Sequence, residues 1–201
     1  MEVNVYNKVN DRNKMELIIN SWRLSHLMAD RGYTKPEVYC LATNIHEIGI
    51  GNFFSVQDSG KSIAYGVITY AQFLNGNRNK KVKQLTYFAV HRELRGNGTG
   101  TKALRQFLQS EVPKGHLCQV SCKPELRSFY ERLGFKYRGI SGNVEEIILV
   151  YSSSKKLKDE DLNKHTIPIQ GFTLKAREQF KNVNNWAISK NIPLSEWGCT
   201  S

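Results

Sequence analysis

The sequence predicts an α/β or α+β domain, in which a mixed sheet packs against helices, followed by a helical tail. From residue 53 onward, strand-like and helix-like apolar patterns succeed one another in the order β-β-β-α-β-α-β. The chain has 201 residues, 40% of them hydrophobic, which suits one globular domain with a substantial core. A polar, charged stretch at 152–161 then separates the sheet-forming region from a last helical segment.

A helix is predicted near the N-terminus, over residues 13–29. Its apolar side chains recur close to the 3.6-residue period, and the polar run from Asp30 to Gly32 ends it. The following residues, 33–50, contain Pro36 and are predicted to be irregular, because no periodicity decides their conformation. The apolar side chains of the helix are Met15, Ile18, Ile19, Trp22 and Leu27.

Three strands are predicted next. Residues 52–57 and 62–73 are rich in β-branched and aromatic side chains, and the turn-forming run Asp58-Ser59-Gly60 joins them. Residues 75–81 are polar and predict a loop. Residues 82–90, VKQLTYFAV, have a strand-like composition again and predict the third strand.

A glycine-rich turn leads into a helix, and a strand, a short helix and a last strand follow. The helix has one apolar stripe and ends near Pro113. Residues 116–122 predict a strand, residues 124–135 a short helix with Gly134 as its C-terminal cap, and residues 145–152 a strand. The apolar stripe consists of Ala103, Leu104, Phe107 and Leu108.

The C-terminal region is predicted to be helical over residues 170–190, where apolar side chains again follow the helical period. The polar segment before it predicts a linker. These apolar side chains are Phe172, Ala176, Phe180, Val183 and Ala187.

Composition narrows the function classes. No stretch approaches the ~18 consecutive apolar residues of a membrane-spanning helix, and the N-terminus lacks the pattern of a signal peptide. No pair of cysteines has the spacing of zinc ligands, so we expect no metal site and reduced thiols in a cytoplasmic protein. The net charge of +11 favours a polyanionic partner, such as a nucleic acid or a phosphorylated cofactor. The cysteines are Cys40, Cys118, Cys122 and Cys199.

The run FAVHRELRGNGTGTKALRQFL, residues 88–108, passes from a strand through dense glycines into a helix. Glycines allow positive φ angles and close approach of a ligand to the main chain. The first N–H groups of a helix have no partner within it, and the helix dipole adds positive charge there. We therefore expect an anion site suited to phosphate, with Arg95 at its mouth. Neither a Walker nor a dinucleotide-binding pattern is present.

Two segments resemble the motifs of one family. VHRELRGNGTG, residues 90–100, resembles the acyl-CoA signature Arg/Gln-x-x-Gly-x-Gly/Ala of the GNAT superfamily of N-acyltransferases. RSFYERLGFKYRG, residues 127–139, resembles that family's second motif, and the order of elements also matches. The resemblance covers about residues 50–151.

The resemblance implies a GNAT-like domain at 1–151, built on a mixed, mostly antiparallel central sheet flanked by helices. A linker at 152–169 and a C-terminal helical extension at 170–201 would follow. The implied cosubstrate is acetyl-CoA, whose pyrophosphate the main-chain N–H groups of the glycine-rich turn would hold. The pantetheine arm would lie where the strand ending at Val90 splays from the strand at 117–122. The implied cofactor-binding residues are Phe88, Ala89, Val90, Arg95, Gly96, Asn97, Gly98, Thr99, Gly100 and Thr101.

The resemblance also implies the chemistry. A neutral primary amine attacks the acyl carbonyl directly, and a main-chain N–H near Val90 stabilises the oxyanion. Tyr130 stands where the family commonly has a general acid that protonates the leaving thiolate; the other reading of Tyr130 is a core aromatic of an amphipathic helix. The general base stays open between His91, His46 and Glu47, although His91 has a structural role at that position in the family.

The predicted function is therefore transfer of an acetyl group from acetyl-CoA to a primary amine of a small molecule or protein, without a metal. The acceptor is not identified by the sequence. The alternative is a GNAT-like basic protein that binds nucleic acid or a protein partner, with an amine on nucleic acid as acceptor or with no catalysis. In that case the C-terminal helix could serve docking or homodimerisation. A candidate nucleic-acid contact cluster is Arg78, Lys80, Lys81 and Lys83.

Overall fold

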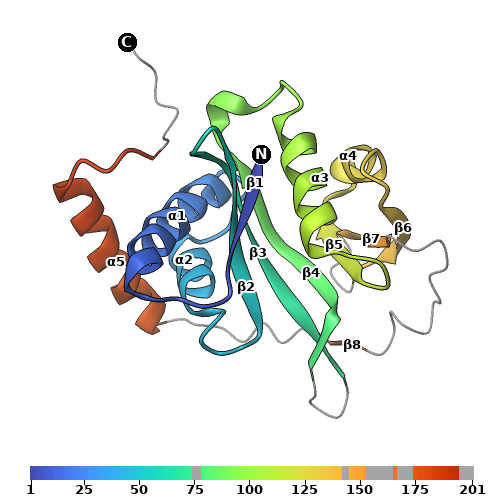
Figure 1. Cartoon of the computed structure of the whole chain (residues 1–201), viewed down its shortest axis with the longest axis horizontal. Coiled ribbons are helices and arrows are strands. Elements are labelled where there is room, and N and C mark those ends of the chain that lie inside the picture. The colour runs from blue at the N-terminus through green and yellow to red at the C-terminus, as the bar shows by residue number, and fades with distance from the viewer. Residues whose placement is uncertain (74–77, 142–144, 153–164, 167–173, 195–201) are drawn as a thin grey trace. The chain divides into compact units, whose positions relative to one another are not determined.

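The computed structural model describes residues 1–73, 78–141, 145–152, 165–166 and 174–194 (Figure 1). The chain divides into two compact units, between which it passes several times. Unit 1 consists of Met1–Val67, Tyr87–Gly100 and Ile169–Ser201, and unit 2 consists of Ile68–Thr86 and Thr101–Pro168. Two long strands, β3 and β4, and the helix α3 have residues in both units.

The strands form a mixed sheet in the order β1-β2-β3-β4-β5-β7-β6, with β8 beside β3. The pairs β1–β2, β5–β7, β6–β7 and β3–β8 are antiparallel, whereas β4 and β5 are parallel. This confirms the predicted mixed, mostly antiparallel sheet. The strands are Glu2–Tyr6 (β1), Gly51–Asp58 (β2), Lys61–Phe73 (β3), Arg78–Val90 (β4), Leu117–Cys122 (β5), Lys136–Ile140 (β6), Ile147–Ser152 (β7) and His165–Thr166 (β8).

Three strands were missed by the pattern analysis. β1 and β6 have five residues each, and β8 has two. Every residue of β6 is exposed or half-buried, so its sequence carries no apolar alternation. These strands form by pairing with a neighbour, Glu2 of β1 with Gln57 of β2 for example, and short edge strands depend on such partners more than on their own sequence.

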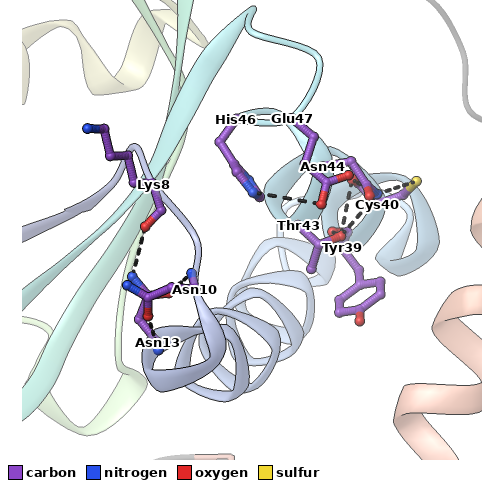
Figure 2. Close-up of polar contacts among 9 residues, drawn as sticks. All are labelled: Lys8, Asn10, Asn13, Tyr39, Cys40, Thr43, Asn44, His46 and Glu47. Atoms are coloured by element: carbon purple, nitrogen blue, oxygen red, sulfur yellow. Dashed lines mark hydrogen bonds and ion pairs between the residues drawn. The ribbon is translucent and has the colours of Figure 1, made fainter.

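The helices are Asp11–Ala29 (α1), Lys35–Asn44 (α2), Thr99–Glu111 (α3), Arg127–Glu131 (α4) and Leu174–Ser189 (α5), with short 3₁₀ turns at Arg92–Leu94 (η1) and Pro124–Leu126 (η2). α1 begins two residues before the predicted start. Its cap explains the difference: the Asn10 side chain accepts from the Asn13 N–H at 3.3 Å, and the Asn13 side chain accepts from the Asn10 N–H at 2.8 Å (Figure 2).

The prediction that residues 33–50 are irregular is wrong, because α2 lies within them. Pro36 stands in the first turn of this helix, where proline is tolerated and fixes a helical φ angle. Five consecutive residues, Val38 to Ala42, are buried. α2 packs against α1, α5 and β2, so it is covered on several sides and lacks the one-sided apolar stripe that reveals a surface helix.

In unit 1, α5 packs on α1 and α2 (Figure 1). Trp22 and Tyr39 form a buried cluster with Val183 and Ala187, and the Trp22 indole donates to the Asn184 side chain at 3.2 Å. Of the predicted linker, Ser152 ends β7 and residues 165–166 form β8; the rest lies outside the described residues. The division into a domain at 1–151, a linker and an extension at 170–201 stays a prediction.

In unit 2, the predicted apolar stripe of α3 is buried: Ala103, Leu104, Phe107 and Leu108. The predicted short helix is divided into η2 and α4, and Gly134 follows it with a φ of +93°, as expected of a C-terminal cap. Lys83 is also buried, and its ammonium donates to the main-chain carbonyl of Glu111. Lys83 is therefore not available to the predicted nucleic-acid cluster.

Candidate functional site

The segment between β4 and α3 is an open, glycine-rich loop. Gly96 and Gly98 have φ angles of +87° and +74°, and a Cβ atom at either position would meet no atom within 4 Å. Glycine is therefore required at these two positions by the backbone conformation and not by packing. Residues 95–98 are exposed, and the first turn of the 13-residue helix α3 follows directly. The predicted glycine-rich turn at the start of a helix is therefore present, and its use as an anion site stays a prediction.

An ion-pair cluster attaches this loop to the end of α1. Asp30, the C-terminal cap of α1, accepts two hydrogen bonds from the Arg92 guanidinium, one of them at 2.8 Å. The Arg95 guanidinium lies 3.8 Å from the same carboxylate and donates through Nε to the Val90 carbonyl at 3.1 Å. The Arg92 hydrogen bonds lower the pKa of Asp30, so the carboxylate is charged at neutral pH. Two arginines and the end of β4 are thus fixed around one carboxylate.

The residues at the end of β4 are buried. Phe88, Ala89 and Val90 all lie in the interior of unit 1. Phe54 of β2 stacks on Phe88 with ring centroids 6.5 Å apart. Gly66 of β3 makes room for this contact, because a Cβ atom there would lie 2.3 Å from the Phe54 ring and 2.8 Å from the Tyr87 carbonyl. Pattern analysis did not single out Gly66, since its requirement comes from a neighbouring strand.

His91, the first candidate base, is a core residue. Its side chain is buried, its Nε2 lies 3.0 Å from the Tyr65 hydroxyl, and its main-chain N–H donates to the Ile63 carbonyl at 3.1 Å. These contacts anchor the end of β4 to β3. The structure therefore favours the structural role of His91.

His46 and Glu47 follow α2 and lie at the end of α1 where that helix begins (Figure 2). The His46 Nε2 atom is 3.9 Å from the Glu47 carboxylate. Met15 of α1 lines the same pocket as His46, whereas Asp30 at the other end of α1 holds the loop. The helix rises about 20 Å between Met15 and Asp30. His46 and Glu47 are therefore remote from the glycine-rich loop, and a role of either as the base stays a prediction.

Tyr130, the candidate acid, belongs to unit 2. Its ring is buried and packs edge-on against Phe129 and Phe135, with centroids 5.0 and 5.3 Å away. The Tyr130 carbonyl accepts from the N–H groups of Leu133 and Phe135, which orders the turn that follows α4. This packing is compatible with both interpretations of Tyr130, a core aromatic and a general acid held in position. The role of Tyr130 therefore stays a prediction.

Cys40, Cys118 and Cys122 are buried cysteines in the thiol form. Burial raises the pKa of Cys118 to about 12 and that of Cys122 to about 11, so both are protonated and unreactive at neutral pH. Within the described residues, no three histidine, cysteine or acidic side chains gather as a metal site would need. No helix in that part of the chain is long and apolar enough to cross a membrane.

The comparisons agree on one family. Residues 49–137 match the family model described as an acetyltransferase (GNAT) domain. A GNAT family acetyltransferase from Brucella melitensis, solved with acetyl-CoA, is similar with a TM-score of 0.52 and 13% identity, over 78% of this chain and 92% of that one. Tetrahymena GCN5 is similar with a TM-score of 0.55 and 12% identity, over 78% and 99%.

An acyl-CoA N-acyltransferase from Pseudomonas aeruginosa is similar with a TM-score of 0.51 and 14% identity, over 75% of this chain and all (100%) of that one. No curated protein matches the chain. At these identities the solved structures establish the fold, and the family model matches the part of the chain that contains both sequence motifs apart from the end of the second.

Proposed function

Because residues 49–137 match the GNAT acetyltransferase domain and the chain has the fold of GNAT acetyltransferases, we propose that it transfers an acetyl group from acetyl-CoA to a primary amine by direct attack. The observation that carries the proposal is the loop between β4 and α3. Gly96 and Gly98 have positive φ angles, and no atom lies within 4 Å of where a Cβ atom would stand at either position. The helix α3 begins immediately after them. A pyrophosphate is the anion that such a loop at a helix N-terminus accepts best.

Arg95 contributes to this site in two ways. Its guanidinium is partly exposed and carries a positive charge at the edge of the loop, where it favours a polyanion. It also donates to the carbonyl of Val90. The Asp30 carboxylate holds Arg92 and draws Arg95 towards it, so the loop keeps its shape before a ligand arrives. Preorganisation of this kind lowers the entropy lost on binding.

In the proposed reaction the nitrogen of a neutral amine attacks the thioester carbonyl carbon. The main-chain N–H of Val90 stabilises the oxyanion that forms, and the bond between carbon and sulfur then breaks. Tyr130 gives a proton to the departing thiolate, and its own proton is restored from water. The amine loses a proton on the way to the amide. We assign this proton to solvent water, because His91 is a core residue and His46 and Glu47 are remote from the loop.

Among the residues that the structure describes, no contact favours the nucleic-acid or partner-binding alternative. Lys83, one member of the candidate cluster, is buried against Glu111. The net charge of +11 remains, and it favours an acceptor that is neutral or acidic over a polycation.

The test begins with binding of coenzyme A and acetyl-CoA to the purified chain by calorimetry, and with a native mass spectrum that would reveal co-purified acyl-CoA. A panel of small amines, peptides and nucleic acids is then incubated with labelled acetyl-CoA. Coenzyme A binding together with a labelled amine supports the proposal. Nucleic-acid binding with a steep salt dependence, in the absence of coenzyme A binding, would favour the alternative.

A further inference from the structure

A pocket of about 450 Å³ lies in unit 1 between the first half of α1, the second half of α2 and the helix α5. Its volume is in the range of small-molecule sites. The pocket is remote from the acyl-CoA loop, because its α1 residues Lys14 to Ile18 lie near the start of that helix, whereas Asp30 holds the loop at its end. The rise between the two is about 20 Å. The pocket is therefore distinct from the loop at which acyl-CoA binding is proposed. A ligand in the pocket would not require acyl transfer.

Part of the pocket lining is apolar. It includes Met15 and Ile18 of α1 and Val183 and Trp186 of α5. Met15 is an exposed large apolar side chain, 51% accessible, and Ile18 and Trp186 are half-buried. An apolar group of a ligand would remove these surfaces from water. The sequence left the role of α5 open. In the structure, α5 contributes Val183 and Trp186 to the pocket lining.

The pocket lining also carries polar groups. Lys14 and Glu47, the lysine and the glutamate among the lining residues, have opposite charges. The Glu47 side chain is 69% exposed, so its carboxylate is accessible to a ligand. A ligand that satisfies both charges must carry an anionic and a cationic group.

His46 is the third polar group. Its side chain lines the pocket and is only 8% exposed. Figure 2 shows its ring pointing into the space between the start of α1 and the end of α2, with the Glu47 carboxylate beside it. The Nδ1 atom is buried and has no hydrogen-bond partner among the described residues. Buried polar atoms of native proteins nearly always have a partner, so the Nδ1 atom of His46 is a group that a polar ligand in this pocket would satisfy.

We propose that this pocket binds a free α-amino acid with an apolar side chain. The apolar side chain contacts Met15, Ile18 and Trp186. The carboxylate is directed towards Lys14 and the ammonium towards Glu47, and the polar head supplies the partner that His46 lacks. The pocket is open to solvent on one side, which suits a ligand that exchanges freely.

The experiment is a titration of the full chain followed by NMR, with the Met15 methyl and Trp186 indole N–H signals as reporters. The probe is L-phenylalanine. Three analogues test the class: phenethylamine lacks the carboxylate, 3-phenylpropionate lacks the ammonium, and L-glutamine has the same head with a polar side chain. We expect millimolar or tighter binding of L-phenylalanine and binding of each analogue that is weaker by about tenfold or more.

Matched variants locate the site. Asn182→Trp places a large ring at the rim on α5, whereas Asn185→Trp makes the same change one turn away, outside the pocket lining. His46→Phe removes the orphaned nitrogen, and His116→Phe makes the same change at a histidine of unit 2 whose Nδ1 is also unpartnered. We expect Asn182→Trp and His46→Phe to lose at least about tenfold in affinity and the two controls to bind as the parent does.

Three outcomes would overturn the proposal. One is the absence of any shift of the reporters with L-phenylalanine at millimolar concentration, in a chain whose melting is normal. Another is equal binding of an analogue that lacks one charge, which would show that the pocket takes an apolar body alone. The third is unchanged binding in both Asn182→Trp and His46→Phe. None of these results affects the acyl-CoA proposal, whose own test is coenzyme A binding.

Discussion

The polar side chains near the two ends of α1 differ in whether they are paired with other groups of the protein. At the end marked by Asp30, the charged and polar groups are paired with one another: Arg92 with Asp30, Arg95 with the Val90 carbonyl and His91 with Tyr65. At the other end, the Nδ1 atom of His46 has no partner among the described residues, and the Glu47 carboxylate is mostly exposed.

The difference separates two ways of preparing a binding site. At the Asp30 end the side chains hold a loop in place, and the proposed ligand meets main-chain N–H groups and the partly exposed Arg95 guanidinium. At the His46 end Asn10 and Asn13 are used in the cap of α1, whereas the Nδ1 atom of His46 has no partner among the described residues and the Glu47 carboxylate is mostly exposed. The first arrangement suits a ligand whose shape is constant, such as a pyrophosphate, and the second suits a ligand that brings its own hydrogen-bonding groups.

The largest effect is expected from Gly98→Val. A β-branched side chain at a φ of +74° strains the loop and covers its main chain, so coenzyme A affinity should fall by at least about 100-fold, or ~2.7 kcal/mol. Calorimetry measures the affinity. The matched control is Gly49→Val, which has a φ of +66° and equally open surroundings after α2. It should lose similar stability, about 1–3 kcal/mol, and bind coenzyme A normally. Normal coenzyme A binding by Gly98→Val would remove the loop from the site.

Tyr130→Phe should have the next largest effect. If Tyr130 protonates the leaving thiolate, turnover should fall by about 10- to 100-fold, the low end for general acids because a thiolate leaves readily. The affinity for acetyl-CoA should change little, and steady-state kinetics with single-turnover controls separate the two. Tyr137→Phe, at an exposed tyrosine of β6, is the control. Equal rates for Tyr130→Phe and the parent chain would leave Tyr130 as a core aromatic.

Asp30→Asn should have a smaller effect, confined to the loop. Without the carboxylate, Arg92 and Arg95 lose their common partner, and the KM for acetyl-CoA should rise by about 3- to 10-fold with an unchanged kcat. Asp11→Asn, at the other end of α1, should leave KM unchanged. A change in kcat without a change in KM would contradict a positioning role for Asp30.

The same variant gives a pH test. The pKa of Asp30 is lowered in the folded chain, mainly by hydrogen bonds from Arg92. The stability that this carboxylate contributes is therefore fully present above its ordinary pKa of about 4 and is lost as the pH falls through the folded value. Melting temperatures of the parent chain and Asp30→Asn should differ at neutral pH and converge in acid.

The smallest effect concerns tyrosine ionisation, which is expected to be shifted in the same direction at Tyr39 and at Tyr87. Burial raises the pKa of Tyr39, at the pocket, and of Tyr87, near the loop, to about 12. A raised tyrosine pKa contributes stability that is fully present below the ordinary value of about 10 and is lost as the pH rises towards 12. Spectrophotometric titration should show both tyrosines ionising late, with no effect on activity at neutral pH. Ionisation of either near pH 10 in the folded chain would show that its end of the unit is open.

The sequence predicted the strands β2 to β5, β7, the helix α3 and the glycine-rich loop well because their signals are local. Alternating apolar residues define a strand, and adjacent glycines define a loop with positive φ angles, whatever the rest of the chain does. The family resemblance rests on two such local motifs, and the acetyltransferase (GNAT) family model matches the chain over residues 49–137, which contain both except the end of the second. The site residues themselves, Arg95 to Thr101 and Tyr130 among them, remain predictions that the experiments above address.

Tertiary structure decided what local patterns could not. α2 was missed because several neighbours cover it, and β1 and β6 because they depend on a paired strand. Asp30 looked like a simple helix end, yet it pairs with an arginine 62 residues further along the chain. Lys83 looked like part of a basic surface, yet it is buried against α3. The pocket at His46 exists only because α5 packs on α1 and α2. Local propensity is a property of neighbouring residues, whereas these features are contacts between distant ones, and folding alone brings those together.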